Sequence, residues 1–223
     1  MKKFIVILAL LSVTTIYAQQ PIERSIGEFS TLKVFDLIEV KLIQSKDNKV
    51  VINGKNKSDV EIVNKDGLLK IRMKLEELFD GNNTSVTLYY SNLDIIDVNE
   101  GARVYTEDII DQFEIDLRAQ EGASIKANIN VKYATIRAVT GGKIEATGKA
   151  DQQDITIYTG GIYQGEACVS VNSDVAIRAA GEAHVYTTNN LDIKIRAGGD
   201  VFVYSDPKTI DESRVLGGRI KRM

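Results

Sequence analysis

Four arginines recur at nearly regular intervals in the second half of the chain, each in the middle of a short apolar triplet. The triplets are Leu117-Arg118-Ala119, Ile136-Arg137-Ala138, Ile177-Arg178-Ala179 and Ile195-Arg196-Ala197. A guanidinium group binds a carboxylate through two parallel hydrogen bonds, so arginines in a row predict a site for an acidic polysaccharide or another carboxylated glycan. The alternative is a solvated strand face, whose arginine stems cover apolar surface and whose charges pair with neighbouring acids.

Tyrosines recur in a second kind of triplet. Tyr105, Tyr186 and Tyr204 each follow a valine, and the spacing of the last two places them one above the other in neighbouring repeats. An exposed tyrosine ring can stack on a sugar, whereas the simpler interpretation is aromatic packing between adjacent strands. The candidate ligand-binding residues are therefore Arg118, Arg137, Arg178, Arg196, Tyr186 and Tyr204.

Sequence patterns for catalysis or metal binding are missing. The chain has one cysteine, Cys168, and one histidine, His184, so no Cys/His metal cluster can form, and no calcium loop of fixed spacing occurs. Cys168 stands between Ala167 and Val169, which predicts a packed strand residue rather than a reactive thiol. We expect no metal, no cofactor and no enzymatic activity. The alternative is a carbohydrate-active enzyme, a polysaccharide lyase or hydrolase, which needs paired carboxylates in a groove.

An internal repeat must position these side chains. The arginine triplets, with Ile157-Tyr158-Thr159 between them, begin 19, 21, 20 and 18 residues apart, and glycine follows each one. A period of about 20 residues with two short strands indicates stacked units, in which the outer triplet residues face the core and the middle one faces solvent. A parallel β-helix and a meander of antiparallel hairpins both fit this pattern. The varying period favours the β-helix, with about five to six coils.

The chain divides into three parts. Residues 1–18 carry two lysines, an apolar run and a small final residue, the pattern of a secretory signal peptide. Residues 19–92 form an N-terminal β region, and residues 93–223 form the repeat region. We expect an exported protein, either periplasmic, at the cell surface or secreted. No later apolar stretch approaches the ~20 residues of a membrane-spanning helix.

The N-terminal region contains β-rich runs separated by turn residues. Asp66-Gly67 between two such runs predicts a hairpin. The stretch from Lys74 to Gly81 predicts a helical turn or two, with Gly81 as the stop. We expect this region and the tail after Pro207 to cap the two ends of the stack.

Three segments carry a family resemblance. They are Phe29-Ser30-Thr31-Leu32-Lys33-Val34, Asp66-Gly67-Leu68-Leu69-Lys70-Ile71 and Leu93-Asp94-Ile95-Ile96-Asp97-Val98-Asn99-Glu100-Gly101-Ala102. Together with the glycine-cornered repeats, they make the chain resemble the autotransporter-adhesin head domain family, also called the GIN domain family, exported β-helix proteins of Bacteroidetes type. The resemblance implies a right-handed β-helix of the pectin-lyase-like kind, a role in adhesion or at the surface, and no established catalytic residues.

The sequence thus predicts an all-β protein, a right-handed single-stranded parallel β-helix preceded by an N-terminal β region. The expected function is that of a non-enzymatic exported cell-envelope protein that binds a glycan or a cell-surface protein. A formal net charge of −3, without a concentrated basic face, argues against nucleic acid as a partner. Besides the enzyme, the alternative is a structural scaffold that self-associates through its ends or edge strands.

Overall fold

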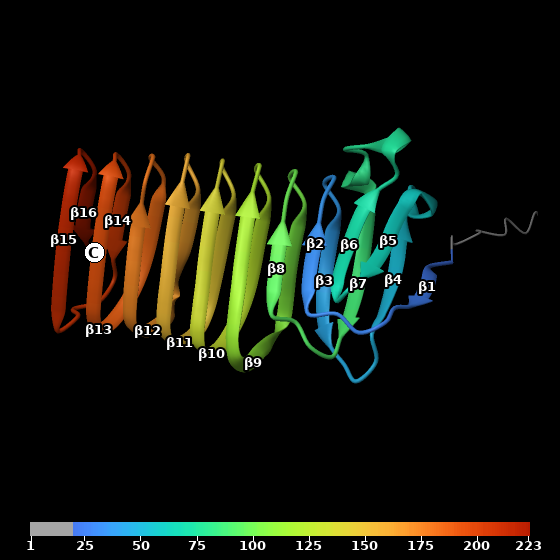
Figure 1. Cartoon of the computed structure of the whole chain (residues 1–223), viewed down its shortest axis with the longest axis horizontal. Helices are drawn as coiled ribbons and strands as arrows, with labels where there is room; N and C mark the ends of the chain where they lie inside the picture. The colour runs from blue at the N-terminus through green and yellow to red at the C-terminus, as the bar shows by residue number, and fades with distance from the viewer. Residues whose placement is uncertain (1–19) are drawn as a thin grey trace, which may run out of the picture.

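The computed structural model describes residues 20–223. They form an all-β solenoid of about seven turns (Figure 1). Its middle consists of β9 (Arg103–Gln120), β10 (Ser124–Val139), β11 (Lys143–Tyr158), β12 (Ile162–Ile177) and β13 (Glu182–Ala197). Neighbouring long strands pair in parallel, which confirms the predicted β-helix and excludes the antiparallel meander. The predicted signal peptide lies outside the described residues.

The solenoid has two broad faces, because each long strand bends midway and contributes one half to each (Figure 1). Face A holds, in spatial order, β5 (Val60–Lys65), β6 (Leu68–Met73), β2 (Thr31–Val34), β8 (Ile95–Val98), the second halves of the long strands, and β15 (Thr209–Leu216). Face B holds β1 (Ile22–Ser25), β4 (Lys49–Gly54), β7 (Thr84–Tyr90), β3 (Glu39–Gln44), the first halves, β14 (Asp200–Val203) and β16 (Arg219–Arg222). Successive coils therefore run up face A and down face B.

Apolar side chains from successive coils stack into rows inside the solenoid. One row on face A passes through Ile136, Ile155, Val175 and Ile193, none more than 2% exposed. No coil could enclose a core alone, so burial depends on the neighbours above and below. The residues between these positions point outward, and they form the surface on which a site must be built.

Tight turns join face A to face B along one edge. In the turn after β10, the Gly142 amide donates to the Val139 carbonyl oxygen at 2.9 Å. The two residues between them, Thr140 and Gly141, have φ values of 48° and 72°. This is a type I′ turn, whose two left-handed positions favour glycine. The glycines after β9 and β11 lie in equivalent turns, closed by Ala123 N–H to Gln120 and by Gly161 N–H to Tyr158.

The N-terminal region is woven into the same solenoid out of sequence order. β2 pairs in parallel with both β6 and β8, and β3 pairs in parallel with both β7 and β9. These strands supply further coils, so the stack has about seven turns where the repeats alone predicted five to six. Strands β1, β4 and β5 pair in antiparallel fashion beyond these coils.

The only helical elements in residues 20–223 are short 3-10 turns. The predicted helical turn is seen at Leu75–Glu77, but Gly81 begins a further 3-10 turn, Gly81–Asn83, rather than ending the first. Within the described part of the chain, none of the helices has the length and hydrophobicity needed to cross a membrane.

Candidate functional site

The four predicted arginines do not form one row. In the strand register, Arg118 of β9 lies opposite Arg137 of β10, but the residue of β11 opposite Arg137 is Thr156. Arg178 and Arg196 lie two residues further along their strands, a shift of about 7 Å. The predicted single row is therefore wrong. The sequence could not reveal the shift, because a strand moved by two residues keeps the same alternation of inward and outward side chains. The arginines thus fall into two pairs in adjacent rows.

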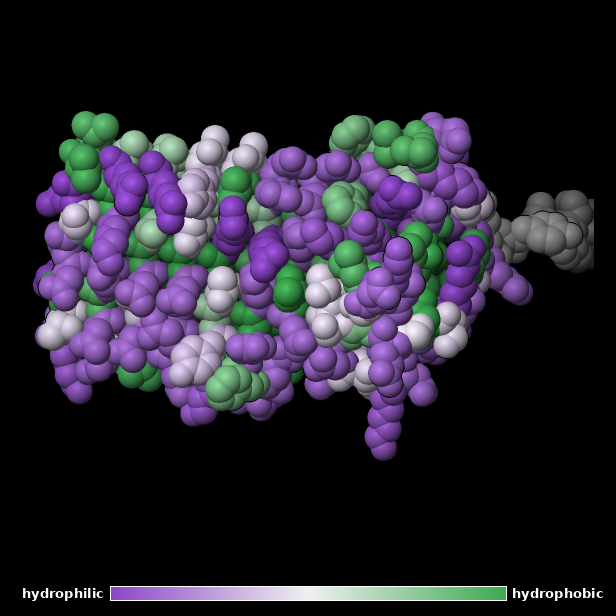
Figure 2. Space-filling model, viewed as in Figure 1, coloured by the Kyte–Doolittle hydropathy of each residue, from purple (hydrophilic) through white to green (hydrophobic). Residues whose placement is uncertain are grey.

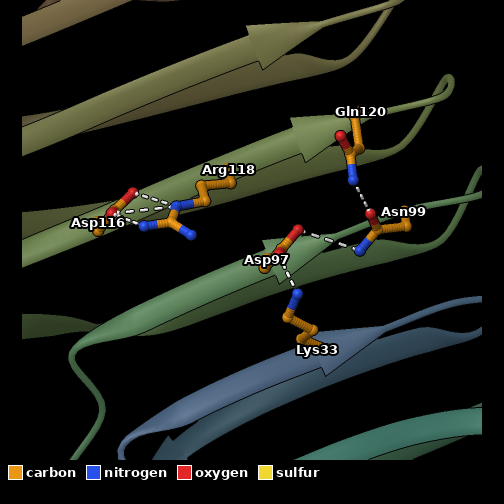
Figure 3. A network of polar contacts seen from close by, with 6 residues as sticks. All are labelled: Lys33, Asp97, Asn99, Asp116, Arg118 and Gln120. Carbon is orange, nitrogen blue, oxygen red and sulfur yellow. Dashed lines mark hydrogen bonds and ion pairs between the residues drawn. The ribbon is translucent and has the colours of Figure 1, made fainter.

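Arg118 is held in a polar network beside the N-terminal coils (Figure 3). Its Nε lies 3.0 Å from Oδ1 of Asp116 and its Nη2 lies 2.5 Å from Oδ2. The hydrogen bond that Arg118 donates to Asp116 raises the pKa of Arg118. Next to this pair, Asp97 accepts from Lys33 at 3.0 Å and from Asn99 at 3.1 Å. Arg118 therefore already has a carboxylate partner, and its role is structural.

Arg137 and Arg178 instead lie against an aromatic ring. The guanidinium carbon of Arg137 is 5.7 Å from the centroid of the Tyr158 ring, and that of Arg178 is 5.1 Å away. A cation at this distance is attracted by the electrons of the ring. Arg196 follows Arg178 in the next coil. Within residues 20–223, none of these three arginines has a carboxylate within 4.0 Å.

A row of aspartates crosses the same face. Register pairing joins Asp154, Asp174, Asp192 and Asp211. Like charges opposite one another on neighbouring strands repel, so this row destabilises the bare surface. Relief is partial: the Gln152 amide donates to Asp154 at 3.3 Å and to Asp174 at 2.8 Å, and Lys194 lies 2.8 Å from Asp192. The hydrogen bond that Lys194 donates to Asp192 raises the pKa of Lys194.

A shallow hollow of about 290 Å³, which we call the central depression, is lined by the aspartate row and by the next outward row, which includes Thr156, Ala176 and Lys194. Its floor is formed by Thr156 and Ala176, whose side chains are small. Lys194 lines it at one end, and Arg137 occupies the same row in the coil beyond Thr156. The row that holds Tyr158, Arg178 and Arg196 lies two residues further along the strands, about 7 Å beyond the floor and about 13 Å from the aspartates. Figure 2 shows hydrophobic surface between two hydrophilic bands over β11 to β13.

The central depression and the arginines beside it offer two complementary sets of groups. The carboxylates of Asp154 and Asp174 accept hydrogen bonds from hydroxyls, and the guanidinium groups of Arg137 and Arg178 donate to a carboxylate. A ring carrying both hydroxyls and a carboxylate can satisfy both sets at once. In the described part of the chain, no group of three or more Asp, Glu, His or Cys side chains is placed to hold a metal ion.

Tyr186 and Tyr204 lie on face B, apart from the arginines. The Tyr204 hydroxyl is 3.0 Å from Nδ1 of His184, and the two rings stack with centroids 5.7 Å apart. His184 also stacks on Phe202, with centroids 4.4 Å apart. Tyr204 is thus half-buried in an aromatic cluster, as the packing interpretation predicts. Tyr186 and Tyr105 are also half-buried, and they do not contribute to the central depression.

The aspartates and the small floor escaped the sequence prediction. Their pattern is an aspartate before an alternating apolar pair, and it occurs in Asp154-Ile155-Thr156-Ile157, Asp174-Val175-Ala176-Ile177 and Asp192-Ile193-Lys194-Ile195. Aligning on this pattern, rather than on arginine, places all three aspartates in one row. It also explains why Ala179 and Ala197, which the arginine alignment predicted to face the core, are exposed.

Comparison with known families decides what kind of protein carries this surface. Residues 28–207 match the model of a family described as "Putative auto-transporter adhesin, head GIN domain". The chain belongs to the head GIN domain family. The resemblance inferred from the sequence is thereby confirmed, and the family is adhesin-like. Among curated proteins, no significant relative is found.

Solved structures share the fold of this head GIN domain. A putative adhesin from Bacteroides fragilis aligns with a TM-score of 0.83 at 15% identity, over 92% of this chain and 98% of that one. A putative adhesin from Parabacteroides distasonis aligns with a TM-score of 0.73 at 16% identity, over 92% and 96%. A putative lipid binding protein from the same species aligns with a TM-score of 0.67 at 18% identity, over 92% and 98%. At these identities the likeness shows the fold alone.

Proposed function

We propose that this protein is a non-enzymatic binding module of the cell envelope and that the central depression binds a carboxylated glycan. The observation that carries the proposal is the placement of Arg178 and Arg196, which have no carboxylate within 4.0 Å in residues 20–223, across a row of small residues from a row of aspartates. Membership of an adhesin-like family supports binding rather than turnover. The signal-peptide pattern of residues 1–18 supports export to the periplasm, the cell surface or beyond.

In the proposed complex, each wall binds a different part of the sugar. Arg178 and Arg196 bind the carboxylate, because a guanidinium fork matches its two oxygens. Asp154 and Asp174 accept hydrogen bonds from ring hydroxyls, which replaces part of their mutual repulsion with attraction. Coils repeat about every 4.8 Å along the stack, so an extended chain lying across the coils meets similar groups more than once. This repetition favours an acidic polysaccharide over a single monosaccharide.

The test is a glycan array probed with the purified mature protein and two matched double variants. In Arg178→Ala with Arg196→Ala, the proposed carboxylate partners are lost. In Arg24→Ala with Arg103→Ala, two exposed arginines of face B are lost, with the same change in net charge. We expect the wild type to bind carboxylated but not neutral glycans. The first variant should bind at least about tenfold more weakly, because charged hydrogen bonds are lost, and the second should match the wild type.

Three results would contradict the proposal. If the wild type binds no carboxylated glycan, the central depression is a solvated surface. If both double variants lose binding equally, the attraction is general electrostatics and not a site. Release of shortened oligosaccharide by a pure sample would instead establish the carbohydrate-active enzyme as the correct alternative.

A further inference from the structure

The last coil replaces apolar core residues with charged ones. Along face A the inward residues of β13 are Leu191, Ile193 and Ile195, and their partners in β15 are Ile210, Glu212 and Arg214. On face B the inward Val203 of β14 pairs with Arg222 of β16. Another apolar coil placed here would bury these charges, at a large desolvation cost. The apolar core of the solenoid therefore ends at this coil by the nature of its side chains.

This coil also carries two strand edges that have no partner among residues 20–223. β15 pairs only with β13, and β16 pairs only with β14. Their outer N–H and C=O groups form a template for another strand. Beside them, Val215 and Leu216 are each 70% exposed. Unsatisfied edges next to exposed apolar side chains are features of a surface that is covered by a partner.

At the C-terminal end of the solenoid, one face extends further than the other, so two copies of this end can fit together. Beyond β13, face B has two strands, β14 and β16, whereas face A has one, β15. A two-fold axis parallel to the strands brings the longer face of one copy against the shorter face of another. β15 of each copy then lies beside β16 of the other. Strands on the two faces run in opposite directions (Figure 1), so both new pairs are antiparallel.

We infer that this end binds a second copy of the chain through two such β15–β16 pairs. The alternative arrangement, with β16 against β16, would bring the Arg219–Arg222 segments, each with three cations, together. β15 carries Asp211 and Glu212 with a single cation, so β15 against β16 is the attractive arrangement.

Side-chain direction also selects a register. Inward residues must meet inward residues, and opposite charges must face one another, so Glu212 lies opposite Arg222 of the second copy. Both groups are available for this. The contact of Glu212 with Arg214 is long, at 3.9 Å, and Arg222 has no carboxylate within 4.0 Å in residues 20–223. Arg219 is already bound by Asp200, with its Nε 2.7 Å from Oδ1.

The dimer has a functional consequence. A two-fold axis parallel to the strands turns face A of the two copies to opposite sides. The two central depressions then point away from each other, so one dimer can join two separate ligands. The dimer itself does not depend on what the central depression binds.

The test is sedimentation velocity of the mature chain from low to high micromolar concentration. We expect a monomer–dimer equilibrium. Glu212→Arg should lower the association constant at least about tenfold, since it places like charges together, and Arg222→Glu should do the same. The double variant, with the two charges exchanged, should restore association. Asp47→Arg is the control, because it makes the same change of charge at an exposed position between β3 and β4, far from β15 and β16.

The proposal is overturned by a wild type that stays monomeric throughout, by open-ended oligomers, or by a dimer that is indifferent to Glu212→Arg. Circular dichroism and thermal unfolding show whether each variant is folded. If a variant is unfolded, hydrogen exchange of the wild type tests the interface instead. Amides of β15 and β16 should gain protection as concentration rises, and unchanged protection would overturn the interface.

Discussion

Cys168 shows how the interior of this solenoid changes the chemistry of a single residue. Its sulfur is fully buried, 3.1 Å from the amide nitrogen of Gln153. Burial penalises the charged thiolate and raises the pKa of Cys168 to about 11, and hydrogen bonds from Tyr163 and Gln153 offset only part of this effect. The sequence prediction of a packed strand residue is confirmed for this cysteine. It rested on the apolar neighbours Ala167 and Val169, although both are themselves exposed, because side chains alternate along the strand.

We predict that native Cys168 resists thiol reagents. At pH 8, a pKa of about 11 leaves roughly a hundredfold less thiolate than the ordinary value of 9.0 does, and burial also blocks access. Maleimide labelling followed by mass spectrometry should find the native protein unmodified and the urea-unfolded protein fully modified. Rapid labelling of the native protein would show that β12 opens or that the thiol is exposed.

At the scale of elements, the turns between the faces depend on two glycines for different reasons. Gly141 has a φ of 72°, but a Cβ added there would meet nothing within 4 Å. A Cβ added to Gly142 would lie 2.1 Å from the carbonyl oxygen of Ala119 in the preceding coil. The first glycine relieves backbone strain, and the second allows neighbouring coils to approach closely.

This difference predicts unequal costs for two adjacent substitutions. Gly141→Ala should reduce the free energy of unfolding by about 1 kcal/mol, the cost of a left-handed alanine. Gly142→Ala should reduce it by about 3 kcal/mol or more, because backbone must move against backbone. Urea unfolding of both variants beside the wild type measures the two values. Equal costs would mean that coil spacing adjusts freely to a methyl group.

The strands and turns could be predicted from the sequence, but the register between neighbouring coils could not. Alternation and corner glycines predicted strands and turns, because both patterns follow from local geometry. They fitted a parallel stack and an antiparallel meander alike, and only the varying period favoured the parallel stack. The register between coils did not follow, since Ile155-Thr156-Ile157 and Ile157-Tyr158-Thr159 alternate in the same way. Only contacts between coils distinguish them. The central depression depends on this register, so its aspartates could not be found from one repeat alone.

At the scale of the whole molecule, the charged last coil shields the ends of the core rows. The side chains of Glu212 and Arg214 continue the rows of Ile193 and Ile195 with groups that tolerate water. Charged inward residues on an edge strand are a common protection against uncontrolled stacking. The same coil can thus limit growth to a single partner.

Removing the last coil should therefore change solution behaviour. A chain that ends after Lys208 lacks β15 and β16 and exposes the apolar rows of β13 and β14. We expect it to aggregate beyond a dimer, because those rows then meet water. Light scattering of the shortened and the full mature chain at equal concentration measures the effect. A shortened chain that remains as small as the full one would show that the charged coil is dispensable.

The arrangement of the N-terminal coils was beyond prediction from the sequence. Short strands such as β2, β6 and β8 were visible as apolar runs, but nothing local indicated that β2 lies between the other two. Such an order is set by the global packing of strands, and local patterns do not encode it.

That order also limits how the gene could lengthen or shorten. From β10 onward each coil pairs only with the coils that precede and follow it in sequence, so a duplicated stretch of about 20 residues could be inserted there without breaking existing pairs. Between β2 and β8 this is not so, because β2 has both of its neighbours later in the chain. A duplication there would separate strands that must meet. Variation in repeat number is therefore confined to the C-terminal part of the solenoid, and the interleaved N-terminal part must be inherited as a unit.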